Sequence, residues 1–366
     1  MDSHMILRDR SLALKVAKYI NEHCSRDRYV IMHVCGTHEY TITHSGIRSL
    51  IPKVDLRAGP GCPVCVASPV NIDLAVKLSL MDNVLVTTFG DMFRVKGSKF
   101  SLMDSKGMGG RVQVVYSIHD AVELARRNPN FEVVHFAIGF ETTAPSTAAM
   151  LLSNPPKNFS IIPTHLLIPP AMLYLLNLGE IRIDGFICPG HVSTIIGVKP
   201  YLDIAYSKRV PMVIAGFEPL DVLMGVAMLI DMINDGEYTV KNEYTRAVRF
   251  EGNVKAIELM NTVFKVSDAY WRGIGFIPKS GLELKDEFSS FDARVRFDVE
   301  VEADYTMPPG CRCGDVLRGL IMPWECPLFA KACTPENPVG PCMVSSEGSC
   351  SIAYKYGGSY LHKIMG

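Results

Sequence analysis

Short apolar runs alternate with helix-like stretches through the first two thirds of this chain. Each run holds four to six residues, mostly apolar or β-branched, between Gly, Pro, Asp or Asn, as expected for a strand buried on both faces. This alternation predicts right-handed crossovers and parallel sheets. The expected strands are Tyr29–His33, Val54–Arg57, Val84–Thr88, Val112–Tyr116, Val133–Ile138, Ser160–Pro163, Gly185–Cys188 and Met212–Ala215. The expected helices are Asn71–Leu80, Asp120–Arg127, Pro145–Leu152, Pro170–Leu178 and Pro219–Asn234.

The strands fall into two consecutive series, and the character of the chain changes after Glu237. The later part offers a tail rich in Pro and Gly, a helix at Val254–Val266, and isolated strands at Tyr244–Phe250 and Arg294–Val301. We therefore expect an α/β protein of two Rossmann-like parallel-sheet domains, at 5–125 and 126–236, and an irregular C-terminal domain at 237–366. The residues before Met5 resemble the remnant of an expression tag, so we expect the natural start there.

The composition is that of an ordinary folded protein, with 48% hydrophobic and 20% charged residues. A net charge of −1 gives no electrostatic case for binding nucleic acid or an anionic membrane. No apolar run approaches the roughly 20 residues that span a bilayer. We expect a cytoplasmic protein, whose exposed thiols stay reduced unless they bind metal or take part in redox chemistry.

Six cysteines gather in the last 56 residues, although this residue is usually scattered thinly. The chain shows no secretory signal and holds an odd total of 11 cysteines, so a framework of extracellular disulfides is a poor explanation. A metal or iron–sulfur site is the better one, with inert thiols as the alternative. The six are Cys311, Cys313, Cys326, Cys333, Cys342 and Cys350.

Four of the six are spaced widely, as C-x14-C-x6-C-x16-C, and would suit a [4Fe–4S] cluster reached from separate loops. Tetrahedral zinc prefers two close pairs, and C-x-C is the only tight spacing here, so zinc is the less natural occupant. The C-terminal domain is therefore expected to be an iron–sulfur domain that depends on metal for its order. The expected ligands are Cys311, Cys326, Cys333 and Cys350, with Cys313 as the alternative to Cys311.

The motif Cys35-Gly36-Thr37-His38-Glu39 follows directly after the first expected strand. Ligands of open parallel sheets gather beyond the carboxyl ends of the strands. A thiol, an imidazole and a carboxylate close together at such a place favour a reactive thiolate or a metal ligand. The alternative is structural, with Cys35 as a small buried residue and His38 as a hydrogen-bonded loop histidine.

A C-x-x-C pair, Cys62 and Cys65, follows the second expected strand after Gly59-Pro60-Gly61. Such a pair can close a disulfide or supply half of a metal site. Both loops leave the same edge of the expected sheet, so these two thiols and Cys35 could form one soft site.

Two later strand ends also carry polar residues. Gly139-Phe140-Glu141-Thr142-Thr143-Ala144-Pro145 places a carboxylate beside the expected interdomain cleft, which makes Glu141 a candidate catalytic residue. The threonines of this motif are better explained by helix capping. His191, after Cys188-Pro189-Gly190, is either a ligand or, more often for a lone histidine, structural.

Together these motifs resemble the HypD family of [NiFe]-hydrogenase maturation proteins over the whole chain. Each motif is weak alone, and the combination is specific. The resemblance implies a scaffold on which Fe(II) acquires two cyanide ligands and one carbon monoxide before delivery to the hydrogenase large subunit. It is carried by the segments 35–39, 59–65 and 139–145, by Trp324-Glu325-Cys326-Pro327, and by Gly340-Pro341-Cys342-Met343-Val344.

The resemblance also implies roles and partners. Cys35 would bind the iron, Cys62 and Cys65 would supply electrons or a further thiolate, and the terminal cysteines would hold a [4Fe–4S] cluster. The expected partners are a HypC-type small chaperone and a HypE-type cyanide donor. The chain would act as an assembly scaffold with redox-active thiols rather than as a conventional turnover enzyme.

Two other functions stay open from the residues alone. One is a thiol–disulfide oxidoreductase in which a cluster reduces the C-x-x-C disulfide for another protein. The other is a structural zinc protein whose loops bind partners.

Overall fold

The computed structural model describes residues 7–358, so the expected start at Met5 lies outside the described residues. The chain forms two compact units, each made of separate stretches. This division differs from the three consecutive domains that we predicted, because strands from the first and the middle part of the chain pair in one sheet. Unit 1 takes the described parts of Met1–Cys62, Ala171–Val254 and Gly310–Gly366, and unit 2 takes Pro63–Pro170 and Lys255–Pro309.

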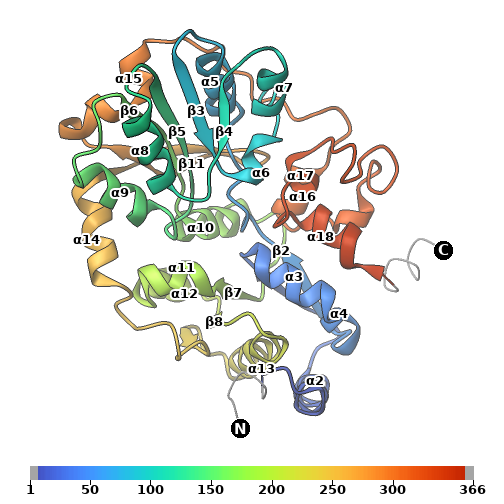
Figure 1. Cartoon of the computed structure of the whole chain (residues 1–366). Coiled ribbons are helices and arrows are strands. Elements are labelled where there is room, and N and C mark those ends of the chain that lie inside the picture. The colour runs from blue at the N-terminus through green and yellow to red at the C-terminus, as the bar shows by residue number, and fades with distance from the viewer. Residues whose placement is uncertain (1–6, 359–366) are drawn as a thin grey trace. The chain divides into compact units, whose positions relative to one another are not determined.

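Unit 1 is built on a five-stranded parallel sheet in the order β2-β1-β7-β8-β9. Buried apolar side chains of α2 and α13 pack against this sheet and form its main core (Figure 1). Its elements are α2 (Arg10–His23), β1 (Tyr29–His33), α3 (Gly36–His44), α4 (Ile47–Leu50), β2 (Val54–Ala58), α10 (Ile168–Leu178), which begins at the boundary, β7 (Gly185–Pro189), α11 (Gly190–Ile196), α12 (Lys199–Lys208), β8 (Met212–Ala215), α13 (Pro219–Asp235) and β9 (Val240–Asn242).

The C-terminal stretch of unit 1 has no strands among its described residues and consists of short helices joined by turns. Parallel pairing places the carboxyl ends of β1, β2, β7 and β8 at one edge of the sheet, which brings the loops after these strands together. The helices of this stretch are α16 (Cys313–Leu317), η2 (Pro323–Glu325), α17 (Pro341–Val344) and α18 (Ser349–Tyr356).

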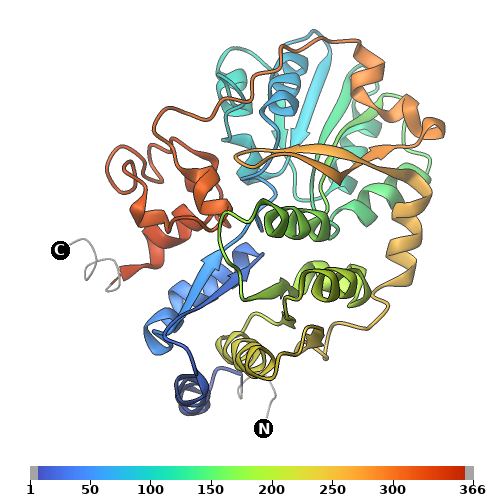
Figure 2. The ribbon, with the colours of Figure 1, turned by 180° about the vertical axis from the view of Figure 1, so that it is seen from behind.

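Unit 2 is built on a four-stranded parallel sheet in the order β4-β3-β5-β6. An antiparallel hairpin, β10-β11, joins this unit through contacts of β11 with β6 (Figure 2). Its elements are α5 (Pro69–Ser79), β3 (Val84–Thr88), α6 (Gly90–Phe93), α7 (Leu102–Gly107), β4 (Val112–Val114), α8 (Ile118–Arg127), β5 (Glu132–Gly139), α9 (Ala144–Leu152), β6 (Phe159–His165), α14 (Val254–Val263), which begins at the boundary, β10 (Phe264–Trp271), β11 (Gly275–Leu284), η1 (Asp286–Phe291) and α15 (Ala293–Phe297).

The α/β class and the two parallel sheets are confirmed. All eight strands and five helices expected in the first two thirds are present, with ends that differ by at most two residues. Buried β-branched runs and clear caps explain this agreement: α8, for example, begins at a capping box of Ser117 and Asp120.

The predictions after Glu237 are less accurate. Tyr244–Phe250 is not a strand, because the Asn242 amide donates to the Val248 carbonyl and closes a turn. Arg294–Val301 is also wrong as a strand, since Asp292 caps a short helix there. The expected helix Val254–Val266 ends at Val263, where β10 begins.

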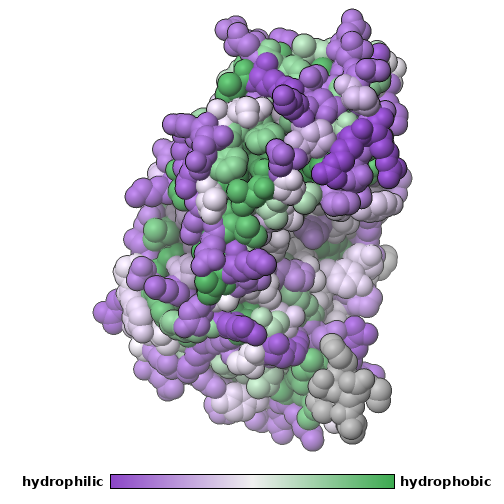
Figure 3. Space-filling view, turned by 60° about the vertical axis from the view of Figure 1, so that its left-hand side comes forward, coloured by the Kyte–Doolittle hydropathy of each residue, from purple (hydrophilic) through white to green (hydrophobic). Residues whose placement is uncertain are grey.

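The helices of the structure are consistent with the lack of long apolar runs in the sequence. None of the helices within residues 7–358 is long and apolar enough to cross a bilayer. On the face drawn in Figure 3, hydrophilic side chains border the hydrophobic areas.

Candidate functional site

Cys35 lies between β1 and α3, as the N-cap residue of that helix. Its side chain is buried, and burial is the main reason that the pKa of Cys35 is raised to about 11. The nearby Glu347 carboxylate acts in the same direction, whereas the backbone N–H groups of His38 and Thr37 lower the pKa. The start of a helix is suited to a thiolate, because its free N–H groups stabilise negative charge.

The loop after β2 packs directly on Cys35. The Gly59 N–H donates to the His33 carbonyl at 2.8 Å, which turns the chain back over the end of β1. A methyl group at Gly61 would overlap the backbone of Cys35, so only glycine permits this approach. The loop therefore brings the next residue, Cys62, to the same edge of unit 1.

Cys62 is a buried cysteine, and its S–H group donates to the Ser345 hydroxyl oxygen at 3.3 Å. Ser345 comes from the C-terminal stretch, directly after the sequence motif that ends at Val344, and sequence reasoning did not identify it. Cys65 is also buried and belongs to unit 2. A joint site of all three thiols stays a prediction.

His38 is fully buried and faces away from solvent. Its Nε2 atom lies 2.9 Å from the Gly216 carbonyl and 3.2 Å from the Ala215 carbonyl, so Nε2 carries the proton. Burial lowers the pKa of His38 to about 3, with a smaller effect of His33. A neutral imidazole results, which holds the loop after β8 against α3.

Glu39 is buried in a polar network inside unit 1. Its carboxylate accepts from Arg48 at 2.7 Å and from Thr43 at 2.7 Å, and lies 2.8 Å from His33 Nε2. Burial opposes ionisation, but Arg48 and His33 outweigh it and lower the pKa of Glu39 to about 2. Glu39 therefore stays ionised and fastens α3 to the sheet. Arg48 was missed, because no motif marks it.

His191 lies at the surface beside the loop that follows β8. Its ring stacks on Phe217 at 4.0 Å, and Phe217 lies 4.8 Å from the ring of His38. Phe217 was not singled out from the sequence, since a lone aromatic residue after a strand carries no specific signal. The aromatic ring connects the exposed and the buried histidine.

Glu141 lies at the end of β5 in unit 2. One carboxylate oxygen accepts from the Ile168 N–H at 3.0 Å, and the other has no hydrogen-bond partner within the described part of the chain. Burial raises the pKa of Glu141 to about 7, against the effect of the Ile168 hydrogen bond. A carboxyl group that exchanges a proton near neutral pH is a reasonable acid–base candidate.

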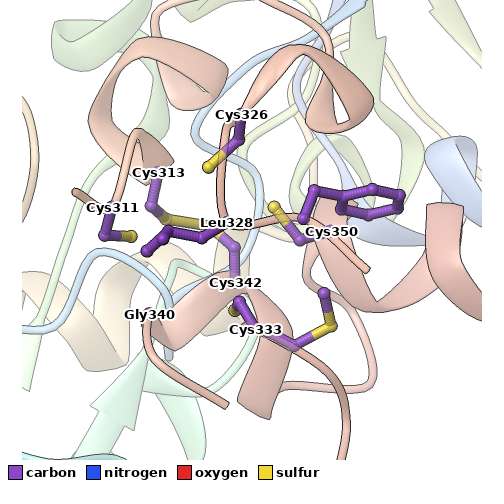
Figure 4. Close-up of a pocket in the computed structure, with 10 residues that line it drawn as sticks. Cys311, Cys313, Cys326, Leu328, Cys333, Gly340, Cys342 and Cys350 are labelled. Carbon is purple, nitrogen blue, oxygen red and sulfur yellow. A yellow bond between two sulfur atoms is a disulfide. The ribbon is translucent and has the colours of Figure 1, made fainter. Parts of the chain in front are cut away.

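The six terminal cysteines line one pocket of unit 1 (Figure 4). Cys313 and Cys342 form a disulfide, with 6.3 Å between their Cα atoms. The four cysteines outside this disulfide are the four expected as cluster ligands, and the sulfur atoms of Cys311, Cys326 and Cys350 point toward the middle of the pocket (Figure 4). Apolar side chains complete the lining: Leu328, Phe329 and Met343.

The four cysteines outside the disulfide lie close enough for the charge of one to affect the pKa of another. The pKa of Cys350 is raised well above its usual value by burial and then by the charges of Cys311, Cys333 and Cys326. No three His, Cys, Asp or Glu side chains in residues 7–358 are drawn together tightly enough to hold a single metal ion. Four thiols around an apolar pocket nevertheless fit a [4Fe–4S] group, in which each iron takes one cysteine.

The cysteine pocket and Cys35 are connected within unit 1. Helix α18, which contains Cys350, packs against α3, which begins after Cys35. The ring of Tyr356 on α18 meets Tyr40 on α3 at 5.0 Å. The N-terminal thiol motif and the C-terminal cysteines therefore belong to one packed region.

Comparisons with known proteins agree with this arrangement of motifs. A sequence model of the family described as "HypD: Hydrogenase formation hypA family" matches residues 11–357. A putative hydrogenase expression/formation protein of Methanocaldococcus jannaschii is 47% identical over 356 residues, which cover 96% of this chain and 98% of that protein. Hydrogenase maturation factor HypD2 of Bradyrhizobium diazoefficiens is 44% identical over 364 residues, covering 96% and 95%. Hydrogenase maturation factor HypD of Cupriavidus necator is 43% identical over 366 residues, covering 96% of both chains. The resemblance seen in the sequence is confirmed, and this chain belongs to the HypD family of hydrogenase maturation factors.

Proposed function

We propose that this chain serves hydrogenase maturation as the scaffold on which an Fe(II) cargo acquires two cyanide ligands and one carbon monoxide. The observation that carries the proposal is the arrangement of unit 1. Cys35 at a helix start, the Cys62 loop and a pocket lined by six cysteines all meet in one packed region. A scaffold of this kind needs a ligand for iron and a source of electrons close to it.

Cys35 is the proposed iron ligand. Low-spin Fe(II) with cyanide and carbonyl ligands is a soft ion, and thiolate is the matching donor. Burial keeps the pKa of Cys35 at about 11, so the thiol is protonated at neutral pH and loses its proton when it binds the metal. The N–H groups at the start of α3 then stabilise the thiolate, and His38 holds the neighbouring loop in place.

The resident cofactor is proposed to be a [4Fe–4S] cluster, which would supply single electrons when bound. The four cysteines outside the Cys313–Cys342 disulfide fit this group, and the disulfide accounts for the other two of the six that line the pocket. The proposed ligands are Cys311, Cys326, Cys333 and Cys350. We favour Cys311 over the alternative Cys313, because Cys313 is bonded to Cys342.

Cys62 and Cys65 are proposed to hold two electrons for cyanide transfer. Release of cyanide from a thiocyanate-like carrier takes two electrons and one proton and leaves a thiol on the carrier. Closing a Cys62–Cys65 disulfide yields two electrons and two protons: both electrons and one proton go to the carrier, and the second proton is released to solvent. Both residues are buried cysteines, and the step requires them in the reduced state.

The proposed partners are a HypC-type small chaperone, a HypE-type cyanide donor and the hydrogenase large subunit. A family role in hydrogenase maturation implies contacts with other maturation proteins. A chaperone thiolate beside Cys35 would complete the iron site and shield it from water.

The test is infrared spectroscopy of the chain co-purified anaerobically with the HypC-type chaperone. We expect infrared bands of iron-bound cyanide and carbonyl in the wild-type complex, and we expect these bands to be lost in Cys35→Ala. Cys24→Ala is the matched control, since Cys24 is a buried thiol in the core of unit 1, away from these motifs. Bands that persist in Cys35→Ala would contradict the assignment.

A second function, a cluster-dependent thiol–disulfide oxidoreductase acting on another protein, is favoured by the disulfide in the cysteine pocket. In that case the wild-type complex would show no cyanide or carbonyl bands. A disulfide substrate would instead be reduced at a rate that depends on Cys62 and Cys65.

A further inference from the structure

The segment Ser345–Gly348 connects the cysteine pocket with the two thiols at the sheet edge. It joins α17, which contains Cys342, to α18, which contains Cys350. All contacts described below lie within unit 1. We call this segment the cover segment.

The first contact of the cover segment is with Cys62. The Cys62 S–H group donates to the Ser345 hydroxyl oxygen at 3.3 Å, and the same oxygen accepts from the Glu347 N–H at 3.2 Å. Because Cys62 is buried, the serine lies on a thiol that solvent does not reach. Ser345 therefore has to move before a reagent or a partner reaches Cys62 from this side.

The second contact is with the residue next to Cys35. A methyl group at Gly36 would lie 2.5 Å from the Glu347 carbonyl oxygen and 2.6 Å from its Cβ atom. The two chains thus touch with no room for a side chain. Cys35 is buried beneath this contact, while Glu347 itself is exposed. The cover segment thus forms an outer layer over Cys35.

Two anchors hold the cover segment in place. On its N-terminal side, the Ser345 N–H donates to the Pro341 carbonyl at 3.1 Å, and a methyl group at Gly348 would overlap the Cys342 carbonyl. Cys342 is bonded in turn to Cys313 at the start of α16. On its C-terminal side, α18 packs against α3. The disulfide is the anchor that chemistry can release.

We propose that the cover segment is a redox-controlled lid over Cys35 and Cys62, held closed by the Cys313–Cys342 disulfide. Reduction of the disulfide frees α17 from α16 and lets Ser345 and Glu347 withdraw, while α18 stays on α3. A cross-link restricts the conformations of the segment that it closes, so its loss raises the population of open states.

The releasing step needs a dithiol reductant, either a small molecule or a protein. One thiolate of the dithiol attacks the sulfur of Cys342 or Cys313, breaks the bond between them and forms a mixed disulfide. The second thiol of the reagent then closes the reagent's own disulfide. Two electrons and two protons have moved to the chain, which leaves both cysteines as thiols.

The experiment measures how fast Cys35 and Cys62 are alkylated. The full chain with its cluster is kept anaerobic, treated or not treated with dithiothreitol, freed of reagent, and exposed to iodoacetamide. Peptide mass spectrometry then gives the rate at each cysteine. If the lid exists, alkylation of both residues should be roughly tenfold faster after reduction, because the cover segment then opens more often. Equal rates before and after reduction would overturn it.

Two variants separate opening of the lid from other effects of the reagent. Cys313→Ser/Cys342→Ser should react fast with or without dithiothreitol. Gly36→Ala should react fast with the disulfide intact, because the added methyl group displaces Glu347. Gly107→Ala is the control, since a methyl group there meets nothing within 4 Å. A slow Gly36→Ala would contradict the proposed position of the lid.

The idea that the lid controls access of the iron cargo to Cys35 rests on the function proposed above. Its test does not, because the alkylation rates are measured without iron cargo or partners. Fast alkylation after reduction together with missing cyanide and carbonyl bands would leave the lid standing and remove the iron scaffold. The reverse result would remove the lid alone.

Discussion

Arg48 donates to the buried carboxylate of Glu39 at 2.7 Å, and its own side chain is only 10% exposed. The same guanidinium donates to the Leu56 carbonyl on β2 and to the Thr43 hydroxyl on α3. A single side chain thus joins the helix that follows Cys35 to the strand that precedes the Cys62 loop. The relative position of the two thiol loops within unit 1 therefore depends on this ion pair.

Arg48→Met should destabilise the protein by about 3–5 kcal/mol, because it leaves the Glu39 charge buried without its main partner. Urea unfolding measures the change. Arg28→Ala is the control: its ion pair with Asp55 involves an arginine side chain that is 62% exposed, so the loss should stay below about 1 kcal/mol. The double variant Arg48→Met/Glu39→Gln should recover part of the stability. If it is no more stable than Arg48→Met alone, the buried charge is not the cause.

The individual strands could be predicted from the sequence, but the order in which they pair into sheets could not. Runs such as Val84–Thr88 are buried on both faces and bounded by turn residues, so local pattern alone fixes them. The pairing of β1 with β7 brings together residues more than 150 positions apart, and no local pattern encodes which parallel strands become neighbours. The hairpin β10-β11 was missed because its exposed face weakens the apolar pattern.

The candidate site shows the same limit. The thiols could be named from the sequence, because cysteine carries its chemistry in its identity and spacing. The residues that position them, Ser345, Arg48 and Phe217, belong to common types and act through contacts made only in the folded chain. The division of six cysteines into one disulfide and four thiols likewise follows from the fold.

Glu141 should make stability fall as pH rises. Its pKa is raised by burial from the ordinary 4.5 to about 7, so the folded state holds a proton that the unfolded state has lost between these values. The loss in the free energy of unfolding is absent below about pH 4.5. It is complete above about pH 7, where it reaches about 3 kcal/mol.

Unfolding of wild type and Glu141→Gln at pH 5 and pH 8 measures this effect. The variant should lose less stability between the two pH values than the wild type does. Glu258→Gln, at an exposed position of α14, should follow the wild type. Parallel curves for wild type and Glu141→Gln would show that the carboxyl group titrates normally.

The two kinds of terminal cysteine should respond differently to substitution. Cys333→Ala removes one of the four proposed ligands, so the anaerobically purified protein should lose the broad absorption of an iron–sulfur cluster near about 400 nm, with its iron and sulfide. Cys342→Ala removes a disulfide partner and should keep the absorption. A colourless Cys342→Ala, or full iron and sulfide in Cys333→Ala, would overturn the assignment of ligands.

Cys35 and Cys62 should have different roles, one as the iron ligand and the other as part of the electron-storing pair. Cys35 has the N–H groups of a helix start beside its sulfur, which suits a persistent ligand, so Cys35→Ala should abolish binding of the iron cargo. Cys62→Ala should keep part of that iron and block cyanide attachment, because it removes a member of the electron-storing pair. His38 is neutral and donates to backbone carbonyls, so His38→Ala should slow maturation more than it removes iron.

The measurement is the iron content of each variant after subtraction of the cluster, together with its cyanide and carbonyl infrared bands. The contrast between Cys35 and Cys62 is informative because both are buried cysteines at the same sheet edge, where the cover segment contacts Cys62 and the neighbour of Cys35, Gly36. Burial and folding defects are therefore similar for the two substitutions, and a difference in iron content reports coordination. Equal loss of iron in both variants would mean that the thiols act as one shared ligand set, and the division between ligand and electron store would have to be abandoned.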